Sequence, residues 1–207
     1  INDFVGGFKE AINETGIVTV EFPHIERLIE NCLFDSIYHE HFSYLSFTVV
    51  KRIFESKGLQ VFDVEEVDTH GGSLRVFAKN KEDKTKDISI RVAQRLEHER
   101  KLGIEDLSYY KNFQDRVDTI IFDLWSFLIQ QKKDKKKVVG YGAAAKANTL
   151  LNFSGVKGTD LIEYCVDASP HKIGKYLPGS HIPVVEEEML KLTKPDYIII
   201  FPWNLKK

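Results

Sequence analysis

The chain has 207 residues, of which 43% are hydrophobic and 12% aromatic, so it can bury a sizeable core and wholesale disorder is excluded. Its 29 basic and 31 acidic residues leave a net charge of -2, which gives no electrostatic reason to expect nucleic acid as the main partner. No apolar stretch reaches the roughly 18 residues of a membrane span, and the first residues lack the pattern of a secretory signal. Two cysteines, Cys32 and Cys165, are too few for a disulfide framework. We therefore expect a cytoplasmic protein with neither nucleic acid nor a membrane as partner.

The first 80 residues predict a strand, a helix and two further strands, in that order. Apolar runs predict the strands, and apolar residues at helical spacing predict the helix. The expected bounds are 16–22 for the first strand, 47–54 for the helix, and 59–67 and 73–79 for the last two strands. Ser46 is a suitable N-cap and Gly58 a suitable stop for the helix, and a turn is expected at 70–72.

Residues 85–136 predict two helices, each with one apolar stripe. The first stripe ends at Gly103 and consists of Ile88, Val92 and Leu96. The second is longer and consists of Tyr110, Phe113, Val117, Ile120, Leu124 and Leu128. Core packing is a sufficient reason for its aromatic residues. The lysine-rich run 132–137 is interpreted as a solvated linker, with a phosphate-binding patch as the alternative.

Residues 138–207 predict alternating strands and helices, and this spacing indicates a parallel sheet. The expected strands are 138–142, 161–167 and 197–201, and the expected helices are 143–153 and one that starts near 186–188. We therefore predict an α/β chain in three parts, with bounds at 1–80, 81–137 and 138–207. The middle part is a helical connector.

The first group of chemically capable side chains lies between residues 38 and 44. It consists of Tyr38, His39, Glu40, His41 and Tyr44. Histidine titrates near neutrality and is the commonest general base, a carboxylate can orient an imidazole, and a phenol can donate to an oxyanion. A zinc site would need a third protein ligand, which His-x-His alone does not supply. Catalysis and a satisfied structural cluster both stay open, and no metal is expected.

The second group is the G-x-G-x-x-A pattern at 140–145, between a predicted strand and a predicted helix. Its glycines permit a tight turn, and a helix N-terminus favours a phosphate. Asp167 ends the next predicted strand, where a dinucleotide enzyme would place the acid that holds the ribose. Lys146 and Asn148 add polar reach near the turn. Nucleotide binding and simple close packing remain alternatives.

The third group is the run from His70 to Arg75. Its two glycines release the chain into a hairpin in the simpler interpretation. In the alternative, the Arg75 guanidinium clamps a phosphate.

Several stretches together resemble one family, the sugar C-methyltransferases that act on nucleotide-linked keto-deoxyhexoses. These stretches follow one another in the right order over almost the whole chain. They are FDSIYHEHFSYLS (34–46), THGGSLR (69–75), VGYGAAAKANTLLN (139–152), KYLPGSHIP (175–183) and PWN (202–204).

This resemblance implies a fold for each part of the chain. Residues 1–80 would be the second half of a class I methyltransferase domain, and 138–207 a Rossmann-like domain that holds the nucleotide sugar. In that family a zinc-binding segment and the half that binds S-adenosylmethionine come first. The chain starts at Ile1, and its only methionine is Met189. A fragment that does not methylate alone is therefore expected.

The resemblance also implies roles for individual residues. His41 would remove the proton beside the sugar ketone, with Glu40 and Tyr38 assisting, and His39 would be the less suitable base. The enolate would then attack the methyl sulfonium of S-adenosylmethionine. The substrate, with thymidine diphosphate as the expected nucleotide, would contact His39, Tyr44, Arg75, Gly142, Ala143, Lys146, Asn148, Lys175 and His181. The sugar, the methylated carbon and the oligomeric state stay open.

Two other classes of protein are weighed against this interpretation. A nicotinamide-dependent oxidoreductase could be built on 138–207, although only three strands fit there and a full dinucleotide site uses two such halves. A non-catalytic module that binds a sugar nucleotide is the second alternative.

Overall fold

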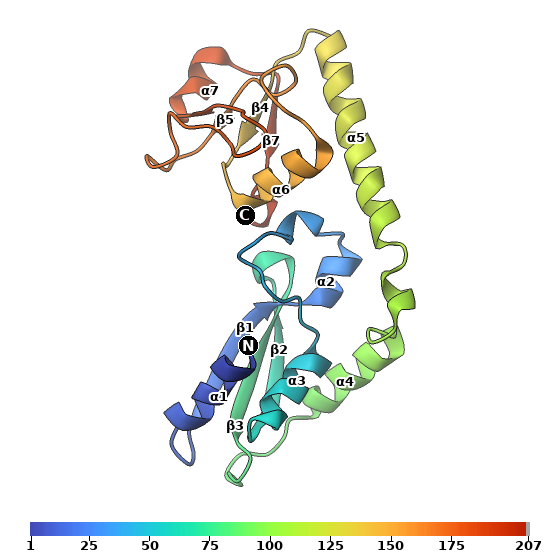
Figure 1. Ribbon diagram of the computed structural model, residues 1–207, viewed down its shortest axis with the longest axis vertical. Coiled ribbons are helices and arrows are strands. Elements are labelled where there is room, and N and C mark those ends of the chain that lie inside the picture. Colours follow the sequence, from blue (N-terminus) through green and yellow to red (C-terminus); the bar gives the residue numbers. More distant parts are fainter. Residues whose placement is uncertain (206–207) are drawn as a thin grey trace. The chain divides into compact units, whose positions relative to one another are not determined.

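The computed structural model describes residues 1–205 and divides into two compact units (Figure 1). The N-terminal unit comprises Ile1–Cys32 and Phe42–Phe113. The C-terminal unit comprises Leu33–His41 and the chain from Gln114 onward. The bounds predicted at 80 and 137 are therefore not the bounds of these units, and a short early segment, 33–41, belongs to the second one. No helix within residues 1–205 is both long and apolar enough to cross a bilayer.

The N-terminal unit has a three-stranded antiparallel sheet in the order β1-β3-β2. The strands are β1 (Ile17–Pro23), β2 (Leu59–Val67) and β3 (Ser73–Asn80). The helices are α1 (Asn2–Ala11), α2 (Ile25–Glu30), α3 (Phe47–Ser56) and α4 (Ile90–Leu102), with short 3-10 turns at Thr69–Gly71 and Leu107–Tyr110. The predicted strand, helix and strand pair are confirmed, whereas α1 and α2 were not predicted.

Local signals explain the helix α3 and its place in the core. The Ser46 hydroxyl accepts a hydrogen bond from Val49 N at 3.2 Å and so caps the helix. Phe47, Val50 and Phe54 then recur on one face and are buried in the core against the sheet. Burial of three such side chains supplies the main driving force for docking the helix.

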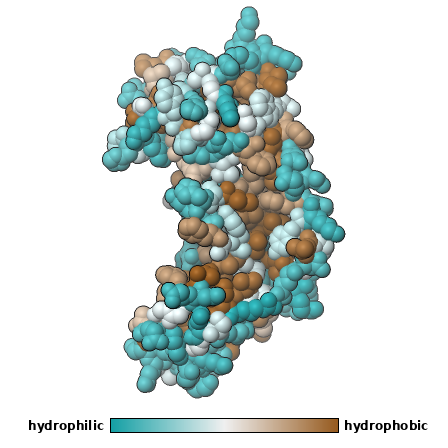
Figure 2. Space-filling model, viewed as in Figure 1, coloured by the Kyte–Doolittle hydropathy of each residue, from teal (hydrophilic) through white to brown (hydrophobic). Residues whose placement is uncertain are grey.

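The N-terminal unit also has an apolar groove of about 440 Å³ beside β1, which is an edge strand. Its lining includes Ile1, Phe4, Phe8, Phe22 and Ile53. Figure 2 shows hydrophobic residues gathered on the surface around the start of α1. Ile1 is 55% and Phe4 68% exposed, so two large apolar side chains at the start of α1 lie open to solvent.

The C-terminal unit has a four-stranded parallel sheet in the order β6-β5-β4-β7. The strands are β4 (Val138–Tyr141), β5 (Cys165–Val166), β6 (Val184–Val185) and β7 (Tyr197–Ile200). The helices are α5 (Phe113–Lys133), α6 (Ala145–Ser154) and α7 (Glu188–Thr193), with 3-10 turns at Phe34–Ser36 and Trp203–Leu205. The predicted parallel sheet and the mixed α/β class are confirmed.

Several predicted bounds in this unit were wrong. The strand predicted at 161–167 is only two residues long, because only Cys165 and Val166 pair with β4 on one side and β6 on the other. The helix predicted from 143 begins at Ala145, since Gly142 has a φ of +89° and the turn takes up the next two residues. Residues 132–136 are exposed, as the solvated-linker interpretation requires.

Candidate functional site

The segment 33–41 forms a short 3-10 helix and a turn, and it packs against α6. The His41 amide donates to the Tyr38 carbonyl at 2.9 Å, which closes the turn. The ring centroids of Tyr38 and His41 lie 4.2 Å apart. Both side chains are half-buried, whereas His39 and Glu40 are exposed. Of the two histidines in this turn, His41 is therefore the more enclosed.

The orientation of His41 is fixed by a backbone group. Its Nδ1 lies 2.8 Å from the Ser36 carbonyl oxygen. A carbonyl oxygen can only accept a hydrogen bond, so Nδ1 must carry a proton. In the neutral imidazole the lone pair is then at Nε2, which is the form that can act as a base. The Ser36 carbonyl, and not Glu40, supplies this orienting contact.

Lys146 of α6 also contacts Ser36, through the serine hydroxyl. Its side chain is 9% exposed. The ammonium lies 3.8 Å from Asp35 Oδ1 and 4.9 Å from the centroid of the Trp203 ring. Burial lowers the pKa of Lys146, and the Asp35 carboxylate works in the opposite direction. Ser36 thus links Lys146 to His41, whose ring packs against Tyr38.

Asp35 completes this cluster by joining the last described turn of the chain to the segment 33–41. Trp203 Nε1 donates to Asp35 Oδ2 at 2.6 Å. The neighbouring Phe34 ring packs against Phe153 of α6, with centroids 5.7 Å apart. Asp35, Ser36 and Trp203 were not among the predicted site residues, although all three lie within the stretches that carry the resemblance.

The glycines of the G-x-G-x-x-A turn have a packing role in this structure. A Cβ at Gly140 would lie 2.5 Å from the Phe201 ring, and a Cβ at Gly142 would lie 2.5 Å from Pro202. Both approaches are far too close for a side chain. The close-packing interpretation therefore explains both glycines without a ligand.

Asp167 caps the same turn. Ala143 N donates to Asp167 Oδ2 at 2.8 Å, Ser169 N donates to Oδ1 at 2.8 Å, and Lys172 Nζ lies 3.0 Å from Oδ2. Burial alone would raise the pKa of Asp167, but these contacts outweigh it and lower the pKa. The carboxylate is thus occupied by protein donors. One of them is the amide of Ala143, a residue that was predicted to bind substrate.

Three other predicted binding residues lie in the C-terminal unit. The Asn148 Oδ1 atom on α6 is buried and has no hydrogen-bond partner among the described residues. Lys175 and His181 are exposed on the loop 175–183. This loop is tied to α6 because Asn152 Nδ2 donates to the Pro178 carbonyl at 2.9 Å.

Tyr44 and Arg75 belong to the N-terminal unit. Arg75 on β3 lies opposite Glu21 on β1, and its Nη2 lies 2.9 Å from Glu21 Oε2. The predicted turn at 70–72 joins β2 to β3, with Gly72 at a φ of +122°. The hairpin interpretation of this run is therefore confirmed, and Arg75 forms a cross-strand ion pair.

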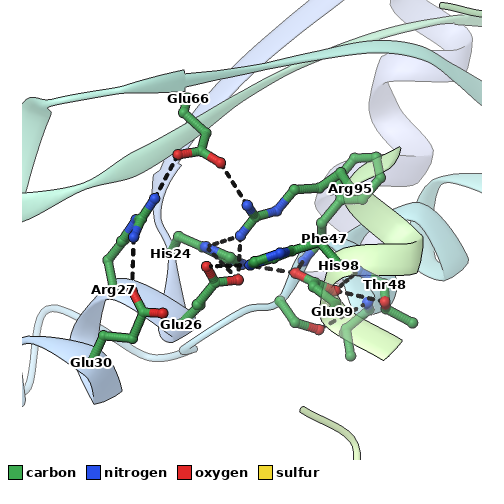
Figure 3. Close-up of polar contacts among 12 residues, drawn as sticks. His24, Glu26, Arg27, Glu30, Phe47, Thr48, Glu66, Arg95, His98 and Glu99 are labelled. Atoms are coloured by element: carbon green, nitrogen blue, oxygen red, sulfur yellow. Dashed lines mark hydrogen bonds and ion pairs between the residues drawn. The ribbon is translucent and has the colours of Figure 1, made fainter. Parts of the chain in front are cut away.

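Sequence reasoning missed a buried polar network in the N-terminal unit (Figure 3). It joins His24 and Glu26, at the start of α2, to Arg95 and Glu99 on α4. His24 Nε2 lies 2.8 Å from Glu99 Oε1, and Arg95 Nη2 contacts both His24 Nδ1, at 3.0 Å, and Glu26. Because arginine only donates, His24 Nδ1 accepts and Nε2 donates to Glu99. Arg95 supplies a positive charge beside Glu26, and the His24 ring lies between Arg95 and Glu99.

Glu99 also caps helix α3. It is fully buried, and it accepts hydrogen bonds from Phe47 N at 2.7 Å, Thr48 N at 2.8 Å and Thr48 Oγ1 at 2.6 Å. Burial alone would raise the pKa of Glu99, but the donors of His24, Thr48 and Phe47 lower it to about 2. His24, Glu26 and Glu99 have ligand atoms close enough for a metal ion, yet Arg95 already supplies the positive charge there. We assign this network a structural role.

A signal for this network was present in the sequence. Val92, Arg95 and Glu99 recur at helical spacing and are the buried residues of α4. The two charged residues thus share the face of the apolar stripe, where a solvated charge would not be expected.

The depressed pKa of Glu99 makes stability depend on pH. A carboxyl group whose pKa falls from 4.5 to about 2 on folding contributes stability above its unfolded pKa, and this stability is lost as the pH falls toward 2. Between about pH 6 and about pH 3, the free energy of unfolding should fall by about 2 kcal/mol more in the wild type than in Glu99→Gln. Urea unfolding at the two pH values measures this difference. Glu97→Gln, on the same helix, is the control and should change the slope much less, because solvent screens the exposed ion pairs of Glu97 with Arg100 and Lys101. Parallel pH dependences of wild type and Glu99→Gln would refute the assignment.

Comparison with known proteins identifies the family that the sequence motifs resemble. Residues 68–207 match the family model described as the C-methyltransferase C-terminal domain. The chain therefore belongs to this C-methyltransferase family, as its motifs indicate. "C-methyltransferase NovU" of Streptomyces niveus is 37% identical over 206 residues, which are 99% of this chain and 48% of that protein. The chain thus spans about half the length of the curated relative that it matches.

Proposed function

We propose that this chain is part of an S-adenosylmethionine-dependent enzyme that methylates the carbon beside the ketone of a nucleotide-linked keto-deoxysugar. The observation that carries the proposal is the geometry of His41, in a chain that belongs to a C-methyltransferase family. A half-buried imidazole with Nδ1–H held by a carbonyl has its Nε2 lone pair available for one proton.

The proposed chemistry begins with proton abstraction by His41. Its Nε2 takes the proton from the carbon next to the ketone, and the electron pair of the broken C–H bond moves into an enolate. The phenol of Tyr38, whose ring packs against His41, is proposed to donate a hydrogen bond to the enolate oxygen. Glu40 is exposed and is proposed to stabilise the imidazolium once it forms. The positive imidazolium then releases its proton to solvent.

The methyl donor supplies an electrophilic methyl group on a sulfonium, which the enolate carbon attacks while the carbon–sulfur bond breaks. We propose that the donor is held mainly by residues outside this chain. The connection from β1, which ends at Pro23, to α2, which starts at Ile25, contains no glycine-rich loop. The edge position of β1 and the apolar groove beside it also support a methyltransferase sheet of which this unit is the second half.

We propose that the C-terminal, Rossmann-like unit holds the nucleoside diphosphate, expected to be thymidine diphosphate. The turn at 142–144 is an unsuitable phosphate site. The Asp167 carboxylate already accepts the hydrogen bond of the Ala143 amide, and its negative charge would repel an anion. The exposed Lys175 and His181 on the loop 175–183 are better placed to meet the diphosphate. Asn148, with an unpartnered buried oxygen, is proposed to accept a hydrogen bond from the nucleoside.

Replacement of Lys175 tests this nucleotide site. Lys175→Gln should weaken binding of thymidine diphosphate by about tenfold, because one charge-assisted hydrogen bond to the phosphate is lost. Isothermal titration calorimetry on the 207-residue chain measures the affinity. Lys191→Gln, at an exposed lysine on α7, is the matched control and should bind as the wild type does. Equal affinity of the Lys175 variant and the wild type would remove the loop from the site.

The same titration separates the proposal from an oxidoreductase. A nicotinamide enzyme would use the Asp167 carboxylate for the ribose, but three protein donors already engage it. We expect no measurable binding of NADH under conditions where thymidine diphosphate binds. Tight binding of NADH alone would favour the oxidoreductase.

A further inference from the structure

Lys146 is a buried lysine to which the proposed function gives no role. Lys146 is 8% exposed, so its ammonium is removed from most solvent and needs polar partners. Those partners are the Ser36 hydroxyl, the Asp35 carboxylate and the face of the Trp203 ring. All of them lie in the C-terminal unit. A lysine enclosed in this way cannot extend toward a diphosphate without breaking these contacts.

Lys146 and the proposed base, His41, contact the same residue. Ser36 is the shared residue: its hydroxyl meets Lys146 Nζ, and its carbonyl meets His41 Nδ1 at 2.8 Å. Asp35 is held from the other side by Trp203 Nε1 at 2.6 Å. Both side chains of the 3-10 turn at 35–36 are therefore fixed, and with them the direction of the Ser36 carbonyl.

We propose that Lys146 is a positioning residue for His41, an inference that rests on the proposed function. By anchoring Ser36, Lys146 keeps the Ser36 carbonyl aimed at Nδ1 of His41. The carbonyl then holds the imidazole in the Nδ1–H tautomer with its lone pair at Nε2. If the turn shifts, the ring loses this constraint and a fraction of the molecules presents an N–H where the base is needed. Lys146 thus acts through Ser36 and does not touch the sugar.

The tautomer of His41 can be measured directly in the 207-residue chain. Nitrogen-15 NMR of the imidazole distinguishes a protonated from an unprotonated ring nitrogen, and the His41 signals are assigned from their loss in His41→Asn. In the wild type at a pH where His41 is neutral, we expect Nδ1 protonated and Nε2 unprotonated. In Lys146→Met, we expect the two nitrogens to shift toward each other, as in a mixture of both tautomers. Lys146→Arg, which keeps a cationic donor, should restore much of the wild-type pattern.

Two further variants serve as controls for packing. Lys172→Met removes another lysine of the same unit, one that pairs with Asp167, and should leave the His41 signals unchanged. Ser36→Ala removes only the hydroxyl that Lys146 contacts, and it should reproduce the tautomer mixture even if Lys146→Met does not fold. An unchanged His41 tautomer in folded Lys146→Met, or in folded Ser36→Ala, would overturn the proposal.

The same variants separate this inference from the proposed function. In a longer chain that includes a donor-binding half, Lys146→Met should lower kcat for methyl transfer by about tenfold and leave KM nearly unchanged, because fewer molecules hold the competent tautomer. A tautomer change without any methyl transfer by the wild type would refute the proposed function and leave the positioning role standing. A rise in KM alone, with the tautomer unchanged, would instead place Lys146 in substrate binding.

Discussion

His41→Asn is expected to reduce methyl transfer by about 10²- to 10⁴-fold in the longer, donor-competent enzyme. Asparagine keeps a polar side chain that can donate to the Ser36 carbonyl, so the turn at 38–41 should persist. What is lost is the basic nitrogen. The loss should therefore appear in kcat, while the affinity for the nucleotide sugar stays close to that of the wild type. Steady-state kinetics with a nucleotide-linked keto-deoxysugar measures both quantities.

His39→Asn is the matched control, because His39 lies two residues away and is exposed. It should retain most of the wild-type turnover. Glu40→Gln should show a milder defect than His41→Asn, since it removes a charge near the base and leaves the base itself. A larger loss in His39→Asn than in His41→Asn would mean that the other histidine is the base.

The largest loss of stability is expected from Arg95→Met. Arg95 is 7% exposed and is the cation that neutralises the fully buried Glu26. Removing one partner of a buried ion pair leaves the other charge uncompensated and typically costs about 3–5 kcal/mol. Methionine fills much of the same volume, so lost packing should add little. Urea unfolding of the 207-residue chain, followed by circular dichroism, measures the free energy of unfolding.

Arg91→Met on the same helix is the control for this variant. Arg91 also pairs with carboxylates, Asp63 and Glu65, but its side chain is 47% exposed. An exposed ion pair contributes about 0–1 kcal/mol. Similar losses in both variants would show that the buried network is no more important than the surface pairs.

The elements with strong local signals could be predicted from the sequence. β1 follows Gly16 and ends at Pro23, and α3 has both a capping serine and an apolar face, so the sequence places each to within one or two residues. The sequence does not predict α2, because this helix has only six residues. One of its buried residues is the charged Glu26, so its buried face has no apolar pattern. β6 has two residues, too few for any periodicity.

The sequence predicts which types of residue form the candidate site, but it does not predict the contacts between them. His41 and Tyr38 stand out because few side chains can serve as base and donor. Ser36 does not stand out, because its role depends on its carbonyl, and every residue has one. The packing of the segment 33–41 on α6 depends on contacts between residues far apart in sequence, such as Asp35 with Trp203. No local pattern contains that information.

The glycines at 140 and 142 had two interpretations, nucleotide binding and close packing, and the sequence left both open. They matched a phosphate-binding pattern, and the sequence could not distinguish that use from close packing. The Phe201 ring and Pro202 occupy the space that a side chain would need, and both lie about sixty residues further along the chain. Variants at these glycines would damage the fold, so they are unsuitable tests of nucleotide binding.

Hydrogen exchange at the carbon beside the sugar ketone tests the central role of His41 most directly. The enzyme is incubated with the nucleotide-linked keto-deoxysugar in deuterated water without methyl donor, so that only proton abstraction and return can occur. The wild type should introduce deuterium at this carbon, and His41→Asn should do so at a rate lower by about 10²- to 10⁴-fold. Exchange at the wild-type rate in His41→Asn would contradict the account, because another group would then remove the proton.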